Sequence, residues 1–402
     1  MRKADVLVIG AGPAGMAAAT RATESGARVI QVDDNASAGG QIWRGASETR
    51  WQTPGIETIF GAQAIARGSN ERTLLFEAGE RSFELGFQRL ILATGARELF
   101  LPFPGWTLPG VFGAGGLQAM VKSGLSVRGK TIVIGGSGPL LLAVAAHLRQ
   151  AGARVKLIAE QAVAKAIVGF GFAMLRYPAK LTQAAGLRLA LAGVRYLLGC
   201  RVEAAEGRGR LERVRLRQGN KIWTEECDYA GIAYGLHANG ELASLLGCRQ
   251  EIDEWQRTAN PAIYAAGECT GIGGVDLAVV EGEIAGYAAC GELERARRLF
   301  GRRDRARSFA KALERTFALR GELRTLPRPA TVVCRCEDVT YEKLQQAASA
   351  RGAKLHTRCG MGACQGRICG AATEFLFGWK PDTVRPPLLP ARVGSLASLE
   401  DL

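Results

Sequence analysis

Apolar runs separated by glycine turns recur along the chain and predict alternating strands and helices. The run Asp5–Ile9 precedes the turn GAGPAG, a helical pattern over Met16–Glu24 and a second apolar run over Arg28–Asp33. The same order of elements returns over residues 130–160. Strands that alternate with helices in this way favour parallel sheets. We therefore predict an α/β fold that contains two Rossmann-like nucleotide-binding domains.

The rest of the pattern predicts the elements around these units. Strands are expected between residues 209 and 235, and residues 161–198 have a helical pattern that places Phe170, Leu175 and Leu181 on core faces. The expected segments are 1–120, 121–235 and 236–290 around the two glycine turns, followed by a basic helical linker at 291–330, a small C-terminal cysteine domain at 331–375 and a tail at 376–402.

Length and charge narrow the class of protein. The 402 residues are 47% hydrophobic and carry a net charge of +14, which suits two to three compact domains. Residues 291–330 hold twelve Lys or Arg against five acids, and so supply about half of that charge. A basic patch binds nucleic acid, anionic lipid or an acidic partner. Because no nucleic-acid motif accompanies the patch, we expect partner docking or a solvated helix face, and no nucleic acid.

The expected location is the cytoplasm. No run approaches the roughly 18 apolar residues of a membrane span, and the apolar start after Met1-Arg2-Lys3 is predicted to be a strand and not a leader. Ten cysteines in a reducing compartment are metal ligands or buried apolar residues. Any contact with the inner membrane is expected to be peripheral.

The first glycine turn has the spacing of a dinucleotide-binding site. Gly10, Gly12 and Gly15 follow a strand and open a helix, and Asp33 ends the next strand. The first glycine permits the turn, the second lets a pyrophosphate approach the backbone, and the third lets helix and strand pack closely. The helix N-terminus favours the phosphate, and the acid accepts hydrogen bonds from a ribose. We expect an adenine nucleotide or dinucleotide at this turn.

Other residues of this expected site lie in the turn itself and at the ends of two further strands. Those in the first half of the chain are Pro13, Ala14, Ala93, Thr94 and Gly95, and the turn Gly267-Glu268 follows an apolar strand in the second half.

The second glycine turn departs from the pattern. When Gly136 is aligned with Gly10, Leu141 takes the position of the third glycine and Ala159 that of the acid, with Glu160 one residue late. Leucine prevents the same close approach of helix and strand. We favour a scaffold without ligand here, and NAD(P)H binding is the alternative.

Four cysteines near the C-terminus are the strongest chemical signal. Cys334-x-Cys336 and Cys364-x4-Cys369 form two close pairs with 27 residues between them. Four thiolates suit a [2Fe–2S] cluster or a structural zinc. Structural zinc usually takes Cys-x2–4-Cys pairs with basic or aromatic residues between them, so the spacing alone leaves both kinds of centre open. Cys359 is a substitute ligand only if Cys369 is left unused.

The remaining chemistry is sparse. Arg358 and Arg367 either offset the negative charge of the cluster or are surface residues. No cysteine precedes Cys200, which argues against disulfide reductase chemistry, and the three histidines belong to no recognisable catalytic set. We therefore expect no catalytic residue in this chain.

Residues 4–290 resemble flavoprotein reductases of the glutathione reductase and thioredoxin reductase type. In those proteins an inserted NAD(P)H domain splits the FAD domain. The resemblance therefore implies a discontinuous first nucleotide-binding domain at 1–120 and 236–290 and an inserted NAD(P)-like domain at 121–235. The resemblance implies that Gly40 and Gln41, in Gly39-Gly40-Gln41, lie against the flavin, and that the turn Gly267-Glu268 meets the ribityl chain. Glutamate stands there where aspartate is usual.

A closer resemblance covers nearly the whole chain. It is carried by VIGAGPAGMAAA, GGQIW, ATGAREL, GSGPLLLAVAAHL, YGLHANGELASLLGC, AAGECTGIGG and the end CRCE…TRCGMGACQGRICG. These stretches are similar to the alpha-type subunit of multi-subunit, dye-linked amino-acid or imino-acid dehydrogenases. That group includes D-hydroxyproline and L-proline dehydrogenases, opine oxidases and hydrogen cyanide synthase. The chain is also similar to part of sarcosine oxidase alpha, and its end resembles the bacterioferritin-associated-ferredoxin-like [2Fe–2S] domain.

The resemblance implies an electron-transfer subunit. The amino acid, imino acid or related amine is oxidised in a partner beta subunit that carries its own FAD, and electrons pass through flavin and a [2Fe–2S] cluster to a quinone or carrier. FMN sits at a subunit interface and a small ferredoxin-like gamma subunit joins in some members. The first nucleotide site holds FAD, ATP or NAD, and the cluster ligands are the four paired cysteines. Two rival hypotheses are a stand-alone NAD(P)H-dependent flavoprotein reductase and an assembly subunit with a structural nucleotide.

Overall fold

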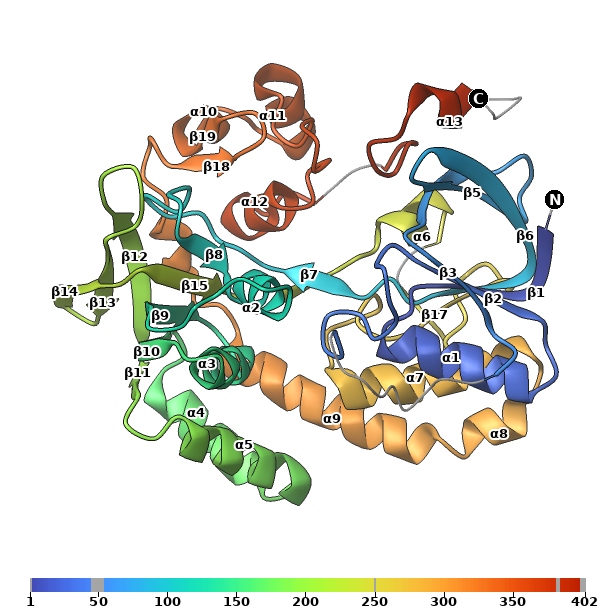
Figure 1. Cartoon of the computed structure of the whole chain (residues 1–402), viewed down its shortest axis with the longest axis horizontal. Helices are drawn as coiled ribbons and strands as arrows, with labels where there is room; N and C mark the ends of the chain where they lie inside the picture. The colour runs from blue at the N-terminus through green and yellow to red at the C-terminus, as the bar shows by residue number, and fades with distance from the viewer. Residues whose placement is uncertain (1, 45–53, 249–250, 381–383, 398–402) are drawn as a thin grey trace. The chain divides into compact units, whose positions relative to one another are not determined.

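The computed structural model describes residues 2–44, 54–248, 251–380 and 384–397 (Figure 1). The chain forms two compact units. The first consists of Met1–Arg97, His237–Ala310 and Thr383–Leu402, and the second of Glu98–Leu236 and Lys311–Asp382. The short strands β7 (Ala96–Glu98) and β16 (Leu236–Ala238) lie where the chain passes from one unit to the other.

The first unit is built on a mixed sheet, which in its described part has seven strands in the order β3-β2-β1-β6-β5-β4, with β17 also paired to β6. Strands β3, β2, β1, β6 and β17 run parallel to one another. Strand β5 pairs antiparallel with both β4 and β6. The strands are β1 (Arg2–Ile9), β2 (Val29–Asp33), β3 (Glu57–Phe60), β4 (Gln63–Arg67), β5 (Thr73–Ala78), β6 (Arg81–Leu92) and β17 (Ile263–Ala265).

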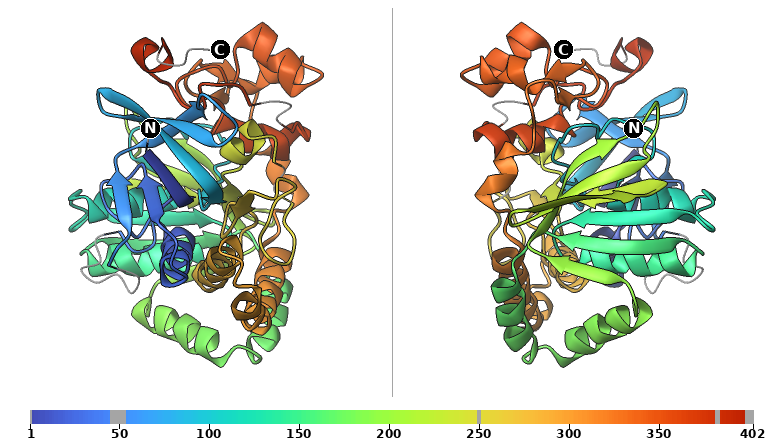
Figure 2. Two further views of the ribbon diagram at one scale, coloured as in Figure 1. Left: turned by 90° about the vertical axis from the view of Figure 1, so that its right-hand side faces the viewer. Right: turned by 90° about the vertical axis from the view of Figure 1, so that its left-hand side faces the viewer.

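Two closely packed helices accompany this sheet. Helix α1 begins at Pro13, whose fixed φ suits a first helical turn, and ends at Glu24. Helix α7 (Val275–Ala289) is almost entirely buried and lies beside α1 (Figure 2). The contact is made through small residues, because a Cβ at Gly282 or Gly286 would collide with the carbonyl oxygens of Ala14 and Ala18. The unit also contains α6 (Glu241–Leu245), α8 (Leu293–Arg297), the first part of α9 (Phe300–Phe317) and α13 (Val393–Ala397).

The second unit contains the second Rossmann-like repeat. A parallel sheet of order β11-β10-β9-β15-β8 packs against α2 and α3, and an antiparallel sheet of order β12-β13-β14 adjoins it. The bounds are β8 (Val111–Gly113), α2 (Ala114–Lys122), β9 (Thr131–Gly136), α3 (Leu140–Gln150), β10 (Arg154–Glu160), β11 (Arg195–Leu198), β12 (Cys200–Glu206), β13 (Arg213–Gln218), β14 (Lys221–Glu226) and β15 (Tyr229–Ala233). Strand β8 pairs with β15 and so belongs to the second unit, and the first segment of the first unit ends at Arg97.

The segment 161–198 differs from its prediction. It forms two helices, α4 (Ala164–Met174) and α5 (Pro178–Ala190), followed by strand β11, which was expected to be helical. The core placement of Leu175 and Leu181 was wrong, since their side chains are 67% and 39% exposed. Helical periodicity identifies an apolar stripe on a helix, but it does not show whether anything in the same chain covers that stripe.

The cysteine segment belongs to the second unit and has a small core of its own, which includes Val333, Leu344 and Ala353. Its elements are β18 (Val332–Cys334), β19 (Val339–Thr340), α10 (Tyr341–Gln345), α11 (Ala350–Thr357) and α12 (Cys369–Phe377), preceded by the 3-10 helix η1 (Gly321–Thr325). The described part of the tail belongs to the first unit, where the Leu388 N–H donates to the Ile65 carbonyl at 2.6 Å. Within the residues described, no helix combines the length and apolar character that crossing a bilayer requires.

The close contact between α1 and α7 yields a stability prediction. Gly286→Ala should lower the free energy of unfolding by about 1–3 kcal/mol, because the new methyl group overpacks the contact with Ala18. Gly301→Ala in α9 is the matched control, because its Cβ meets nothing within 4 Å; it should leave stability unchanged or raise it by up to about 1 kcal/mol. Thermal unfolding of both variants measures this. Equal midpoints would show that α1 and α7 do not pack so closely.

Candidate functional site

The first glycine turn is shaped by close approaches of the backbone. Gly10 has φ +107°, and a Cβ there would collide with the carbonyl oxygen of Ala93. A Cβ at Gly15 would collide with the Gly10 carbonyl. Gly12 differs, because its Cβ would meet only the Gly40 Cα, at 4.0 Å. The turn is therefore closed toward the sheet and open at Gly12, where a pyrophosphate needs to approach.

The strand ends expected at this turn do meet there. The Ala93 N–H donates to the Ile9 carbonyl at 2.8 Å, which places the end of β6 beside the end of β1. Gly267 has φ +80°, and a Cβ on it would lie 2.6 Å from that of Ala14 at the start of α1. We call residues 10–15, 39–40, 93–95 and 267 the cradle.

Two further residues that were expected at this site adjoin the cradle in the sequence. Gln41 follows Gly40 and is exposed, and Glu268 follows Gly267 and is half-buried. Burial raises the pKa of the Glu268 carboxyl, and the N–H of Gly274 opposes that shift.

Asp33 is buried at the end of β2 and already accepts hydrogen bonds from the protein. Its Oδ2 accepts from the Ala11 N–H inside the glycine turn, and its Oδ1 accepts from the Asn35 N–H at 2.7 Å. The carboxylate thus fixes the turn to the end of β2. Oδ1 also accepts from the Asn35 side-chain amide at 2.7 Å, so the lone pair that a ribose hydroxyl would use is on Oδ2.

Polar residues that the sequence did not indicate form hydrogen bonds with backbone groups of the cradle. The Asn239 side chain donates to the Thr94 carbonyl at 2.8 Å, and the Asn239 N–H donates to the Gly95 carbonyl at 3.0 Å. The buried carboxylate of Glu281 accepts from the Gly267 N–H at 3.2 Å and pairs with Arg307 at 2.8 Å. The Asn239 contact joins residues 145 apart in the chain, so no local pattern could have indicated it.

The second glycine turn keeps the acid that the sequence alignment placed one residue late. A register shift between Val155 and Leu157 in β10 absorbs one residue, so Glu160 lies opposite Gly136. Its oxygens accept from the N–H groups of Gly138 and Ala162, both at 2.8 Å, in the manner of Asp33 in the first turn. Burial raises the pKa of Glu160 to about 7, against the lowering effect of those N–H groups. Glu160, and not Ala159, is therefore the counterpart of the ribose-binding acid.

The mouth of this second turn is nevertheless occupied by the chain itself. The Ser137 hydroxyl donates to the Phe317 carbonyl at 3.0 Å. The Gln161 amide donates to the Ser137 hydroxyl at 2.9 Å and to the Ala318 carbonyl at 3.1 Å. In folds of this kind dinucleotides bind at the carboxyl ends of the strands. Here the end of α9 lies at that position.

The cysteine segment brings sulfurs together from three places in the chain. The Sγ atoms of Cys334, Cys359 and Cys369 all lie within 4.8 Å of one another, and all three side chains are buried. Cys359, which the sequence ranked behind the four paired cysteines, is thus part of the tight group. Hydrogen bonds from the thiols of Cys359 and then Cys369 lower the pKa of Cys334.

Cys336 and Cys364 form a second sulfur pair beside this group. The Cys364 backbone N–H and thiol both interact with the Cys336 sulfur, and a Cβ at Gly362 would collide with the Cys336 Cβ. The N–H groups of Gly360 and Glu337 point at the Cys334 sulfur. Tight turns that aim N–H groups at sulfurs are what a thiolate-bound metal centre needs. The five cysteines 334, 336, 359, 364 and 369 are called the cysteine cluster.

The arginines near the cysteine cluster have their own partners. Arg358 pairs with Glu337 at 2.7 Å and is 66% exposed, so its charge is largely offset by that carboxylate. The Arg367 guanidinium donates to the Cys364 carbonyl at 3.5 Å. The donor set of the cluster, five thiols with backbone N–H groups directed at two of them, fits a centre that needs four thiolates.

Comparison with known proteins agrees with the fold. A sequence model of the family described as pyridine nucleotide-disulphide oxidoreductase matches residues 4–285. Among solved structures, the chain is similar to L-proline dehydrogenase from P. horikoshii, with a TM-score of 0.67 and 19% identity over 98% of this chain and 79% of that one. Thioredoxin reductase from T. acidophilum is similar at a TM-score of 0.55 and 19% identity over 73% of this chain and 99% of that one.

Curated relatives match over nearly their full length. The chain is 31% identical to the HcnB subunit of hydrogen cyanide synthase from Pseudomonas aeruginosa, over 90% of each chain. It is also 31% identical to the A subunit of opine oxidase from Rhizobium meliloti, over 98% of each chain. The chain therefore belongs to the pyridine nucleotide-disulphide oxidoreductase family of flavin oxidoreductases, in the branch that contains these oxidase and synthase subunits.

Proposed function

We propose that this chain is the electron-transfer subunit of a hetero-oligomeric flavin-dependent dehydrogenase that oxidises an amino acid, an imino acid or a related amine. The observation that carries the proposal is that one chain contains both the cradle, which is open at Gly12, and the cysteine cluster. Relatives named as subunits of opine oxidase and hydrogen cyanide synthase support it. The substrate belongs to the D-hydroxyproline, proline, opine or glycine type.

The cradle is proposed to hold FAD, with ATP or NAD as the other occupants of the same site. The open face at Gly12 and the helix that begins at Pro13 fit a pyrophosphate. A bound flavin would supply the change from two-electron to one-electron chemistry. The proposed binding residues are Gly10, Gly12, Pro13, Ala14, Gly15, Asp33, Gly40, Gln41, Ala93, Thr94, Gly95, Gly267 and Glu268. A second flavin, FMN, is proposed for an interface with the partner.

The cysteine cluster is proposed to hold a [2Fe–2S] cluster on Cys334, Cys336, Cys364 and Cys369. A two-iron centre takes two thiolates on each iron. The sulfur atoms form two such pairs. Those of Cys334 and Cys369 lie within 4.8 Å of each other, and the Cys336 sulfur interacts with Cys364. Such a centre supplies one-electron transfer when it is bound. Cys359 would then be a buried neighbour of the ligands.

The proposed partner is a beta subunit that carries FAD and the substrate site, and the further component is a ferredoxin-like gamma subunit. An exposed apolar surface supports docking of a protein. Val168 and Phe172 lie along α4, Leu175 follows its last residue, and Phe172 is 71% exposed. Residues 161–202 contain no Asp or Glu, so this surface is also basic and suits an acidic partner. The proposed location is the cytoplasm, with at most peripheral membrane contact.

The rival function, a stand-alone NAD(P)H-dependent reductase, requires a working second dinucleotide site. The hydrogen bonds from Ser137 and Gln161 to the carbonyls of Phe317 and Ala318 oppose that hypothesis. The assembly-subunit hypothesis predicts a bound nucleotide without a metal centre, so it differs from the proposal at the cysteine cluster.

The function is tested on the native complex under anaerobic conditions. An amino acid, imino acid or opine of the right type should bleach the flavin absorbance within seconds, whereas NADH and NADPH should leave it unchanged because the second turn is closed. Rapid bleaching by NADH, with no response to any amine, would contradict the proposal and support the reductase.

The cradle is tested by Gly12→Val. The site around Gly12 is open, so the fold should persist, while the branched side chain fills the space that a pyrophosphate needs. We expect the nucleotide content of the purified protein, measured by mass spectrometry after heat extraction, to fall about tenfold or more, with a thermal midpoint close to that of apo wild type. Unchanged nucleotide content would place the ligand elsewhere.

The ligand set is tested by two serine variants. Cys364→Ser should abolish the visible absorbance of the iron–sulfur centre, because it removes one of four ligands. Cys359→Ser is the matched control and should retain that absorbance, and both variants should keep their nucleotide. The opposite result, loss with Cys359→Ser and retention with Cys364→Ser, would assign the metal to the three buried thiols of Cys334, Cys359 and Cys369.

A further inference from the structure

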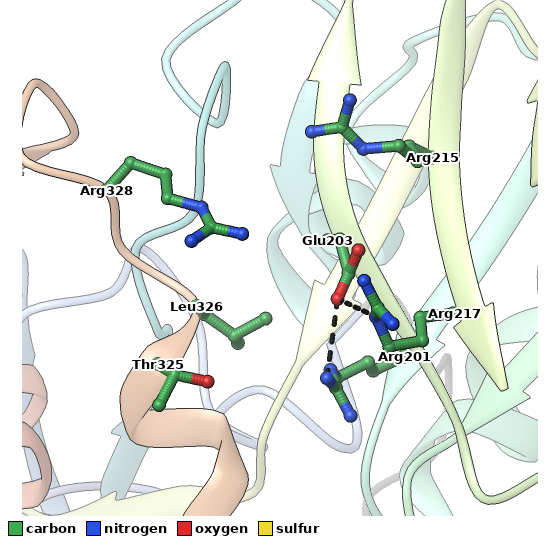
Figure 3. A pocket seen from close by; sticks show the side chains of 7 residues that line it. All are labelled: Arg201, Glu203, Arg215, Arg217, Thr325, Leu326 and Arg328. Carbon is green, nitrogen blue, oxygen red and sulfur yellow. Dashed lines mark hydrogen bonds and ion pairs between the residues drawn. The ribbon is translucent and has the colours of Figure 1, made fainter. Parts of the chain in front are cut away.

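A pocket rich in arginine lies in the second unit, apart from the second glycine turn and the cysteine cluster. It has a volume of about 160 Å³ and is lined by Arg201, Glu203, Arg215, Arg217, Thr325, Leu326 and Arg328. Figure 3 shows guanidinium groups facing the pocket from two sides: Arg201, Arg215 and Arg217 come from strands β12 and β13, and Arg328 comes from the segment after η1. Neither the sequence motifs nor the proposed function uses this pocket.

The charge of the pocket is positive after its ion pairs are counted. Glu203 is held between the guanidinium groups of Arg201, at 3.3 Å, and Arg217. Four arginines and one glutamate in the lining leave a net charge of +3.

The carboxylates just outside the lining do not cancel this charge. Glu206 pairs with Arg215 at 3.1 Å and also with Arg213, and Glu322 pairs with Arg201 at 2.7 Å and also with Arg320. The lining residues and their ion-pair partners together comprise six arginines and three glutamates, which again leaves +3. The arginines are Arg201, Arg213, Arg215, Arg217, Arg320 and Arg328.

Two donors in the pocket have no partner in the described part of the protein. No ion pair to the Arg328 side chain is formed within the described residues, although that side chain is directed at the other arginines (Figure 3). The Nε atom of Arg201 is buried and makes no hydrogen bond. Like charges brought together with donors left over are costly unless an anion joins them.

The size and donor type limit the ligand. Sites that enclose a whole drug-sized ligand have about 300–1,000 Å³, so a pocket of about 160 Å³ takes a smaller group. Guanidinium forks match the paired oxygens of phosphate or carboxylate. Because the arginines approach from two sides, a tetrahedral group with oxygens in several directions satisfies more of them than a planar carboxylate.

We propose that this arginine pocket binds a dianionic phosphate group, either free phosphate or the phosphate of a small monoester. The bound group would join strands β12 and β13 to the segment at Thr325–Arg328, which leads directly into β18 and Cys334. Occupancy would therefore tether the chain that enters the cysteine cluster. The inference depends on neither the nucleotide nor the metal centre.

The test is isothermal titration of the full-length protein with inorganic phosphate and, separately, with glycerol 2-phosphate. Arg328→Gln and Arg215→Gln should each weaken binding about tenfold or more, because each removes charge-assisted hydrogen bonds. Arg213→Gln is the matched control. Arg213 lies on the same strand as Arg215 and shares its partner Glu206, but it does not line the pocket, so binding should change less than about threefold.

The two ligands distinguish the source of the phosphate. Tighter binding of glycerol 2-phosphate supports a monoester, and binding of inorganic phosphate alone supports the free ion. The proposal is overturned if wild type binds neither, if Arg328→Gln and Arg215→Gln bind as wild type does, or if Arg213→Gln weakens binding equally, which would indicate diffuse charge. Equal binding of succinate would overturn the assignment to phosphate.

Discussion

The absence of side chains at the first glycine turn is the constraint on which the nucleotide site depends. Gly10 and Gly15 allow the ends of β1 and β6 and the start of α1 to approach within backbone contact, and no residue with a Cβ fits at either position. Gly267 brings a third strand end to the same place. Because the protein's own atoms close the turn on one side, the open approach is at Gly12, in front of the helix N-terminus. The proposed position of the phosphate rests on this packing.

The buried carboxylate of Glu281 stabilises that packing. Glu281 is 3% exposed, pairs with Arg307 and accepts from the Gly267 N–H, so one carboxylate links α7, α9 and the third strand end. Because Arg307 is 33% exposed and Glu281 is buried, loss of this pair would leave the charge of the Glu281 carboxylate uncompensated. A buried carboxylate also fixes the backbone of the second glycine turn, but that turn is closed. Glu160 fixes its backbone as Asp33 fixes the first turn, but the carbonyls of residues 317–318 then occupy its mouth. The two glycine turns therefore differ: the first is open at Gly12, and the second is covered by residues of the same chain.

Local patterns in the sequence predicted much of this structure. The two strand–turn–helix repeats and the grouping of the C-terminal cysteines follow from spacing along the chain, whereas the arrival of Gly267 at the first turn is implied by the resemblance to flavoprotein reductases. The failures have physical reasons. The alignment missed Glu160 because a register shift in β10 adds one residue that spacing cannot reveal. It missed the closed second turn and the arginine pocket because both join residues more than 100 positions apart. Exposure of Leu175 was missed because periodicity does not report what covers a helix.

We propose that one polypeptide pairs an adenine-nucleotide site with a thiolate-bound iron–sulfur centre. Elemental and cofactor analysis of anaerobically purified protein measures both sites in one sample. We expect about two irons and two acid-labile sulfides per chain, together with about one adenine nucleotide. Zinc in place of iron, without sulfide, would refute the proposal.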